Sequence, residues 1–466
     1  MPDYPEFKSY GPQANIIFPP LGLEYIASYI IDIADIIILD KRLKNVNLDT
    51  IRRTLIEFNP DYVGISFNYT FQIERILEIT KLCRKFGFKT VIGGWHPTLA
   101  PSETLNYESI DIIVRGEGEL TFRELLENGG TIDVLGLSYK INGVQIHNKD
   151  REFISMSGSR LPYRSYRDEM KIEYAYLGFP IDYIETSRGC PYSCKFCCIH
   201  NFYRRSYRTR SVESIIKELK TPNIKNHAGL IYIVDDNFTV NRKFINQLCD
   251  EIIENKINKY FMAQARVDMI VKHPELFKKM ADAGFIFLFL GLESFSDRAL
   301  KMLNKQIKFK QIQLALQILH DLGYIIQGNI IIGADLKEKK QDLESQINIT
   351  KSLNIDLPTF SLLTPFPGTA LMDEVLEKNL LLTNDFRKYN WAEPVIKYPF
   401  LTPTDLKYYL SKAYKETLFS KKPFTRILQL IFLRGFRYHL IRLLNFAIIK
   451  GLFKFLFSNL HNKDKY

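Results

Sequence analysis

Short apolar runs alternate with helix-like segments along most of the chain, and this alternation occurs in two series. The first series has apolar runs at residues 34–40, 61–67, 89–94 and 111–115. Strands that alternate with helices at this spacing predict a parallel, doubly wound sheet. Such sheets bind ligands at the carboxyl ends of their strands. The residues at those ends are Asp40, Ser66, Gly93, Gly94, Gly116 and Glu117.

The second series predicts a barrel. Six further apolar runs have helical patterns between them, and they lie at residues 181–187, 229–234, 260–265, 285–290, 325–332 and 359–363. Six strand–helix units are typical of an open (β/α)6 barrel of the TIM type, whose active site lies at the carboxyl ends of its strands. Polar or small residues fall at or just after those ends: Asp235, Gln264, Arg266, Glu293 and Gly333.

We therefore expect an α/β protein in four parts. A Rossmann-like domain occupies residues 1–135. A linker at 136–175 contains a hairpin around the turn-forming pair Asn142-Gly143, and we expect it to carry no chemistry of its own. The barrel occupies residues 176–400, and a helical tail occupies residues 401–466.

Three cysteines lie within eight residues, just after the first strand of the predicted barrel. Cys190, Cys194 and Cys197 are soft ligands, and thiolates at this density suit zinc or an iron–sulfur cluster. A cubane cluster has four irons, so three cysteines would leave one iron open to a substrate-like molecule. The alternative is a zinc knuckle completed by Cys198 or His200, because a closed zinc site has four ligands.

Composition limits where the protein works. The six cysteines do not resemble a disulfide framework and indicate a reducing compartment, and Cys83 and Cys249 are interpreted as buried packing residues. The polar N-terminus predicts no signal peptide. No run of about 18 apolar residues occurs, so we expect no membrane-spanning helix. These features together predict a cytoplasmic protein.

The positive charge is concentrated in the tail. From Lys421 onward ten basic residues accompany one acid, so this segment carries +9 of the net charge of +11. The rest of the chain is nearly neutral, and we therefore expect no nucleic-acid partner. Between residues 425 and 457, Arg and Lys recur among aliphatic and aromatic residues, which is typical of an amphipathic helix in an anionic membrane interface. The alternatives are a helix packed on the barrel and a helix that binds a partner or RNA.

The cysteine spacing, with Phe196 before the last cysteine, resembles the radical S-adenosylmethionine (SAM) superfamily. The resemblance implies a [4Fe–4S] cluster on Cys190, Cys194 and Cys197, whose open iron binds SAM and cleaves it to a 5′-deoxyadenosyl radical. It also implies SAM contacts from residues on or near the barrel strands: Phe196, Asp235, Gln264, Arg266, Glu293 and Gly333. An electron donor such as ferredoxin or flavodoxin is implied as a partner.

The first half resembles the cobalamin-binding domain of class B radical SAM proteins. The resemblance is carried by residues 19–29, 93–97 and 115–119, and it implies cobalamin contacts from Ser66, Gly93, Gly94, Gly116 and Glu117. The Asp-x-His-x-x-Gly motif of cobalt-ligating domains is absent, so cobalt is expected to be bound without a protein His, and His96 is interpreted as shaping its loop. The alternative is a degenerate α/β domain that only shapes the substrate cavity.

Class B proteins of this kind act on hopanoids, tetraether lipids or porphyrin esters. With the tail, the resemblance implies an enzyme at the inner face of the membrane that forms a carbon–carbon bond on a membrane lipid, by ring formation in tetraether chains or by polyol attachment. The alternatives are a cobalamin-dependent C-methyltransferase or oxidative cyclase acting on a porphyrin or peptide, and a non-catalytic or zinc-bound binding protein.

Overall fold

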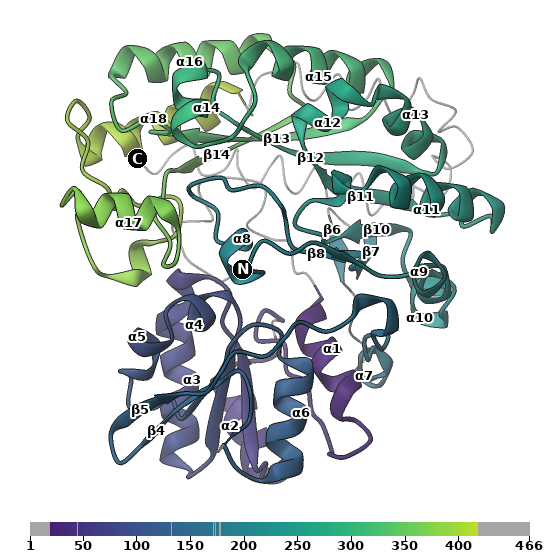
Figure 1. Ribbon diagram of the computed structural model, residues 1–466, viewed down its shortest axis with the longest axis vertical. Helices are drawn as coiled ribbons and strands as arrows, with labels where there is room; N and C mark the ends of the chain where they lie inside the picture. The colour runs from purple at the N-terminus through teal and green to yellow at the C-terminus, as the bar shows by residue number, and fades with distance from the viewer. Residues whose placement is uncertain are drawn as a thin grey trace.

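The computed structural model describes residues 19–417, apart from 44, 132, 171, 173, 177 and 178. The chain forms two α/β units stacked along the long axis of the molecule, with the N-terminal unit at one end and the barrel at the other (Figure 1). The basic segment predicted at 421–466 lies outside the described residues. Within the described part, no helix is both long enough and apolar enough to cross a bilayer.

The N-terminal unit is built on a five-stranded sheet in the order β1-β2-β3-β4-β5. The first three strands are parallel, as predicted, and comprise β1 (Tyr62–Ser66), β2 (Lys89–Gly93) and β3 (Ile112–Val114). The predicted hairpin forms β4 (Leu137–Ile141) and β5 (Val144–His147), and β4 pairs antiparallel with β3. The hairpin thus extends this sheet beyond the boundary expected at residue 135.

Helices flank this sheet and are held by local signals in the sequence. Helix α2 (Leu48–Phe58) begins at Asn47, whose side chain accepts a hydrogen bond from the Thr50 amide, and it ends at Asn59 in the left-handed conformation. It packs against α3 (Ile73–Lys85), while α1 packs against α6. The remaining helices are α1 (Leu21–Ile30), α4 (Trp95–Leu99), α5 (Pro101–Leu105) and α6 (Glu119–Asn128).

One predicted strand is wrong. Residues 34–40 have no regular secondary structure, and Ile37 is 45% exposed. Strand β1 is therefore the edge of the sheet that the described residues form. The side chains of 36–39 line a large cavity instead. An apolar run indicates contact with an apolar surface, but it does not specify a hydrogen-bonding partner for the backbone.

The barrel contains the six parallel strands predicted. They form a curled sheet in the order β14-β13-β12-β11-β10-β7, with β6 (Ala175–Tyr176) antiparallel at the edge. Their bounds are Phe179–Ile184 (β7), Leu230–Ile233 (β10), Tyr260–Ala265 (β11), Phe285–Glu293 (β12), Ile325–Ile332 (β13) and Leu357–Leu362 (β14). A short ribbon of β8 (Ser187–Arg188) and β9 (Arg208–Thr209) follows β7.

Helices cover the outer face of the barrel sheet. Outward side chains such as Ile326 and Ile330 join the helices in the largest apolar core, whereas the alternate side chains point into the barrel. The helices are α7 (Ser165–Glu169), α8 (Ile199–Phe202), α9 (Val212–Leu219), α10 (Pro222–His227), α11 (Arg242–Glu254), α12 (Val267–Lys272), α13 (Pro274–Asp282), α14 (Asp297–Met302), α15 (Phe309–Asp321), α16 (Lys340–Ser352), α17 (Ala370–Glu377) and α18 (Pro403–Thr417).

A buried ion-pair network, which we call the seam, joins the two units where α1 and α7 lie side by side (Figure 1). Arg167 binds Glu24 of α1 with contacts of 2.5 and 2.7 Å and binds Asp182 of β7 at 2.9 Å. Arg164 binds Glu218 of α9 at 2.7 Å. The segment expected to be a plain linker therefore supplies the cations that hold the N-terminal unit to the barrel.

We predict that Arg167→Met will destabilise the protein by about 3–5 kcal/mol, because Glu24 would be left buried without its counter-charge and Asp182 would keep only its 3.4 Å contact with Arg164. The midpoint of urea unfolding, followed by circular dichroism, measures this loss. Lys351→Met, which removes a surface pair with Glu416, is the matched control and should cost less than about 1 kcal/mol. Equal shifts for the two variants would show that the seam does not hold the units together.

Candidate active site

A cavity of about 2160 Å³ is lined by both units. Its walls include the carboxyl ends of β1 and β2 on one side and the interior of the barrel on the other. Pockets for a single small ligand have volumes of roughly 300–1,000 Å³. This cavity therefore has room for more than one ligand.

The three predicted cluster ligands, Cys190, Cys194 and Cys197, all line this cavity, but Cys198 does not. Hydrogen bonds from another segment hold the loop that carries them. The Lys195 amide donates to the Leu303 carbonyl at 3.0 Å, and the Asn304 side chain donates to the Ser193 carbonyl at 2.8 Å. The loop is therefore anchored to the segment that follows α14.

The chemistry of the loop fits an iron–sulfur cluster. Among the described residues, no three His, Cys, Asp or Glu side chains converge as ligands of a single metal ion. A cubane cluster instead takes each thiolate on a different iron. Burial raises the pKa of Cys190 and Cys197, so iron binding must displace their protons. The Asn237 amide lies 3.9 Å from the Cys190 sulfur and the Arg266 guanidinium lies 4.0 Å from the Cys194 sulfur, where both can stabilise thiolate charge.

Four of the six residues expected at a SAM site line the cavity: Phe196, Gln264, Arg266 and Glu293. Asp235 does not. Its buried carboxylate accepts hydrogen bonds from the Thr186 amide and hydroxyl and from the Ser187 hydroxyl, at 2.5–2.7 Å. Its neighbour Asp236 does line the cavity and accepts from the Gly189 amide at 3.1 Å.

Gly333, the sixth residue, also lies away from the cavity lining. Its φ of 77° is left-handed, and its carbonyl accepts a hydrogen bond from the Tyr398 hydroxyl at 2.7 Å. A Cβ at this position would lie 2.7 Å from that hydroxyl oxygen. The glycine is thus required for the turn after β13.

Lys305 is a cavity residue that sequence analysis missed. Its ammonium lies 2.6 Å from the Glu293 carboxylate, and both side chains are buried. Arg266 pairs with Asp268 at 2.8 Å and donates to the Lys305 carbonyl at 3.0 Å. Two cations and two anions therefore lie beside the cysteine loop, which suits the zwitterionic amino-acid group of SAM. No local sequence pattern predicts Lys305 as a site residue, because helix α14 separates it in the sequence from its partner Glu293.

All five residues expected at a cobalamin site line the cavity: Ser66, Gly93, Gly94, Gly116 and Glu117. Gly94 has a φ of 121°, and a Cβ there would lie 2.5 Å from the Phe67 carbonyl oxygen. Only glycine therefore fits this loop, which leaves its backbone open to a large planar ligand. The donors and small residues present are compatible with cobalamin.

His96 does not line the cavity. Its Nδ1 lies 3.0 Å from the Thr70 hydroxyl, and its ring packs against Phe67 and Phe386. Burial lowers the pKa of His96 to about 4, so the ring is neutral at physiological pH. These contacts agree with a role in shaping the loop.

A second ion-pair group, which we call the clasp, ties the cobalamin-type loop to the cysteine loop. Arg188 binds Glu117 at 3.1 Å, Glu119 at 2.7 Å and Glu185 at 2.8 Å. Arg208 binds Glu117 at 2.6 Å. Burial would raise the pKa of Glu117, but the two arginines outweigh it and hold that pKa below its ordinary value. Glu117 thus already has protein partners, although it faces the cavity.

We predict that Cys190→Ala protein, reconstituted with iron and sulfide without oxygen, will lose the brown colour and the electron paramagnetic resonance (EPR) signal of a [4Fe–4S] cluster. Cys198→Ala is the matched control and should retain both, because Cys198 lies outside the cavity lining. Loss of the cluster from Cys198→Ala protein with retention in Cys190→Ala protein would contradict the assignment.

Comparison with known proteins identifies the domain type of both units. The family model for the B12 binding domain matches residues 13–126, and the model for the radical SAM superfamily matches residues 184–345. An uncharacterized methyltransferase of Pyrococcus horikoshii is 33% identical over 403 residues, which cover 85% of this chain and 87% of that protein.

Two further relatives have assigned activities in their names. The anaerobic magnesium-protoporphyrin IX monomethyl ester cyclase of Rubrivivax gelatinosus is 25% identical over 90% of this chain and 78% of its own length. The hopanoid C-3 methylase of Methylococcus capsulatus is 28% identical over 81% of this chain and 72% of its own length.

The fold is shared with a solved structure, that of the cobalamin-dependent SAM radical enzyme OxsB with aqua-cobalamin and SAM bound. The TM-score is 0.70 at 21% identity, and the match covers 86% of this chain and 64% of that chain. The resemblance drawn from the sequence is thus confirmed. This chain belongs to the cobalamin-binding class of radical SAM enzymes, which use a [4Fe–4S] cluster, SAM and cobalamin.

Proposed function

We propose that this enzyme forms a carbon–carbon bond at an unactivated carbon of a membrane lipid held in the cavity between the two units. Ring formation in an isoprenoid chain and attachment of a polyol headgroup are the reactions that we favour. When bound, the cluster, SAM and cobalamin would supply the radical, methyl-transfer and electron-transfer chemistry. The protein supplies the binding surface, and one feature of that surface carries the proposal.

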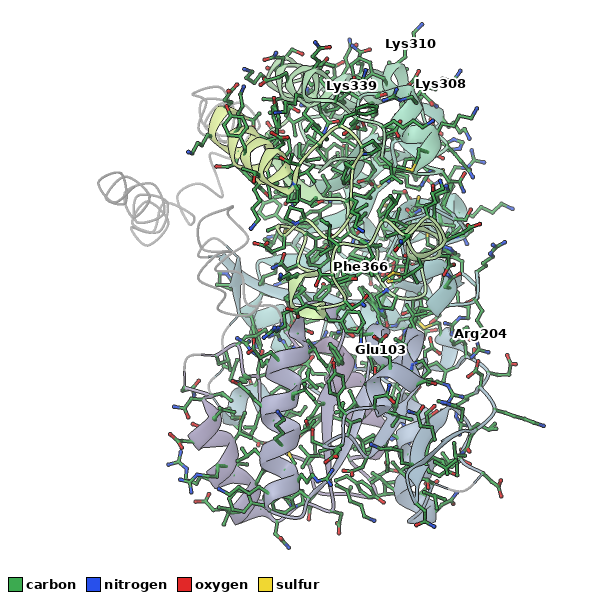
Figure 2. All side chains as sticks on the ribbon, turned by 90° about the vertical axis from the view of Figure 1, so that its left-hand side faces the viewer. Glu103, Arg204, Lys308, Lys310, Lys339 and Phe366 are labelled. Atoms are coloured by element: carbon green, nitrogen blue, oxygen red, sulfur yellow. The ribbon has the colours of Figure 1, made fainter. Side chains whose placement is uncertain are left out.

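That feature is a group of five cavity-lining rings, which we call the aromatic wall: Tyr69, Phe71, Trp95, Phe366 and Trp391. Trp391 contacts Tyr69, Phe71 and Phe366 edge-on, at centroid distances of 5.3–5.5 Å. Tyr69 also contacts Trp95 edge-on at 5.9 Å. Figure 2 shows Phe366 near the level at which the two units meet. The wall therefore draws rings from both units onto one face of the cavity.

Trp391 is held in this wall at a conformational cost. Its φ of 64° is left-handed, which is unusual for a bulky residue. The Asn390 side chain accepts hydrogen bonds from the amides of residues 392 and 393, and the Trp391 carbonyl accepts from the Leu362 amide at 2.7 Å. Backbone strain of this kind is common at binding sites, where surrounding contacts hold the strained residue in place.

An apolar substrate suits this wall. Aromatic faces bind hydrocarbon or flat ring systems and exclude water, and a radical generated beside them would be protected from solvent. Arg266, Lys305 and Glu293, which line the cavity beside the cysteine loop, would orient SAM. The hopanoid relative is named for an apolar lipid and the cyclase for a flat tetrapyrrole, and both agree with such a wall.

The second candidate is a cobalamin-dependent C-methyltransferase or oxidative cyclase acting on a porphyrin or peptide. One observation favours it: the relative that is 33% identical is named a methyltransferase. The methyltransferase form of this candidate differs from the lipid proposal in what happens to the methyl group of SAM, and the cyclase form differs in its substrate.

We predict that enzyme supplied with SAM carrying a deuterated methyl group, a reductant and a lipid extract will form 5′-deoxyadenosine and a lipid product without deuterium, as detected by mass spectrometry. Trp391→Ala should reduce product formation at least about tenfold while SAM cleavage continues, because the wall positions the substrate. Deuterium in the lipid product would show methyl transfer to the lipid and contradict ring formation and polyol attachment, and no lipid product at all would contradict the proposal.

We also propose that residues 421–466 bring the enzyme to the inner face of the membrane. Full-length protein should float with anionic vesicles and be released by high salt, because the attraction of the basic segment to lipid headgroups is screened by ions. Protein that ends at residue 420 is the control and should remain at the bottom of the gradient. Equal flotation of both forms would contradict this role.

A further inference from the structure

The barrel interior carries a group of uncharged polar side chains, which we call the neutral belt. Its members are Tyr232 on β10, Gln264 on β11, Gln327 and Asn329 on β13, and Thr359 on β14. All five line the cavity. They precede the strand ends that carry Arg266 and Glu293, and therefore lie deeper in the barrel than the charged groups beside the cysteine loop.

Strand register brings these side chains together. Gln264 and Gln327 both pair with Phe289 of the strand between them, and Asn329 pairs with Thr359. Gln264 donates to the Tyr232 hydroxyl at 3.3 Å, and Thr359 donates to the Asn329 amide oxygen. Asn329 is exposed to the cavity although it lies in the middle of a central strand. Gln327 and Thr359 also line the cavity but are only 5% and 7% exposed, so Asn329 is the most accessible member of the belt.

The belt has hydrogen-bonding capacity left over. Across residues 19–417 as described, no protein group donates to the side-chain oxygens of Gln264 and Gln327, and none accepts from the Asn329 amide nitrogen. A ligand that offers both donors and acceptors would satisfy these groups. Leaving them unpaired against an apolar ligand would cost stability in the complex.

The belt also lacks charge. Of the cations that line the cavity, the three near the cysteine loop, Arg188, Arg266 and Lys305, are each already paired with a carboxylate. The other four, Lys41, Arg42, Arg75 and Lys89, belong to the N-terminal unit and not to the barrel interior that carries the belt. A carboxylate or phosphate lodged against the belt would therefore be buried without a counter-charge, which is strongly unfavourable. A hydroxyl, by contrast, both donates and accepts hydrogen bonds.

We infer that the neutral belt binds an uncharged, hydroxyl-bearing end of the substrate, while the aromatic wall holds its apolar body. This inference rests on the proposed function, because it assumes that a lipid occupies the cavity. It narrows the substrate class to neutral amphiphiles such as alcohols and glycerol ethers. It disfavours fatty acids, phospholipid headgroups and free porphyrin carboxylates at this position.

Equilibrium dialysis of the cofactor-loaded enzyme with saturating SAM tests this inference. The probes are a monoalkyl glycerol ether and the fatty acid of the same chain length, both kept below their micelle-forming concentrations. We expect the glycerol ether to bind at least about tenfold more tightly, since one probe satisfies the belt and the other buries a charge. Equal affinities, or displacement of the ether by SAM, would overturn the inference.

Variants locate the binding to the belt. Gln327→Leu should weaken binding of the glycerol ether about tenfold, and Thr359→Val, which changes shape very little, should weaken it several-fold. Gln313→Leu on the exposed face of α15 is the matched control and should leave affinity unchanged. Unchanged affinity in both belt variants would overturn the inference.

Equilibrium dialysis measures binding without turnover. It therefore tests the neutral belt independently of the proposed function. Absence of a lipid product with preserved ether selectivity would contradict the proposed function alone. Loss of selectivity in an enzyme that still modifies lipids would contradict the neutral belt alone.

Discussion

The pairing of buried arginines with buried carboxylates is the interaction on which the rest of this structure depends. The cavity has walls from both units, so it exists only while they are held in one orientation. Arg167 in the seam and Arg188 in the clasp each bind carboxylates from both sides of that boundary. Charges buried in this way are costly to separate, because each needs its partner. The same contacts bring the glycine-rich loop of the N-terminal unit against the cysteine loop of the barrel.

Different parts of the cavity are lined by different kinds of side chain. Paired charges surround the cysteine loop, where a zwitterionic cofactor and a metal cluster need them. Aromatic rings cover the face where the two units meet, and uncharged amides and hydroxyls lie within the barrel. Each zone suits one kind of ligand and disfavours the others, since unpaired charges and unsatisfied polar groups are both expensive in an enclosed site. A substrate that is apolar at one end and neutral but polar at the other fits this order.

The sequence predicted most of the fold, and the three cysteines that it singled out do line the cavity. The periodicity of apolar residues predicted the nine parallel strands of the described structure. It could do so because burial and alternation are local signals in a sequence. It failed at 34–40, where an apolar run lines a cavity instead of joining the sheet. The sequence did not predict Arg188 or Lys305 as site residues. Arg188 binds Glu117 and Glu119 of the N-terminal unit, and Lys305 binds Glu293 across helix α14, so neither role follows from a local pattern. Between Asp235 and Asp236, only the geometry of the loop decides which carboxylate faces the cavity.

We infer that the cluster and cobalamin occupy the same cavity, because the cysteine loop and the glycine-rich loops of the N-terminal unit both line it. EPR of the reduced enzyme loaded with both cofactors, with cobalt in its paramagnetic Co(II) state, tests this claim most directly. The account predicts that the signals of the cluster and of cobalt are split or broadened by magnetic coupling, and that the coupling vanishes when either cofactor is omitted. A spectrum equal to the sum of the two separate signals would contradict it.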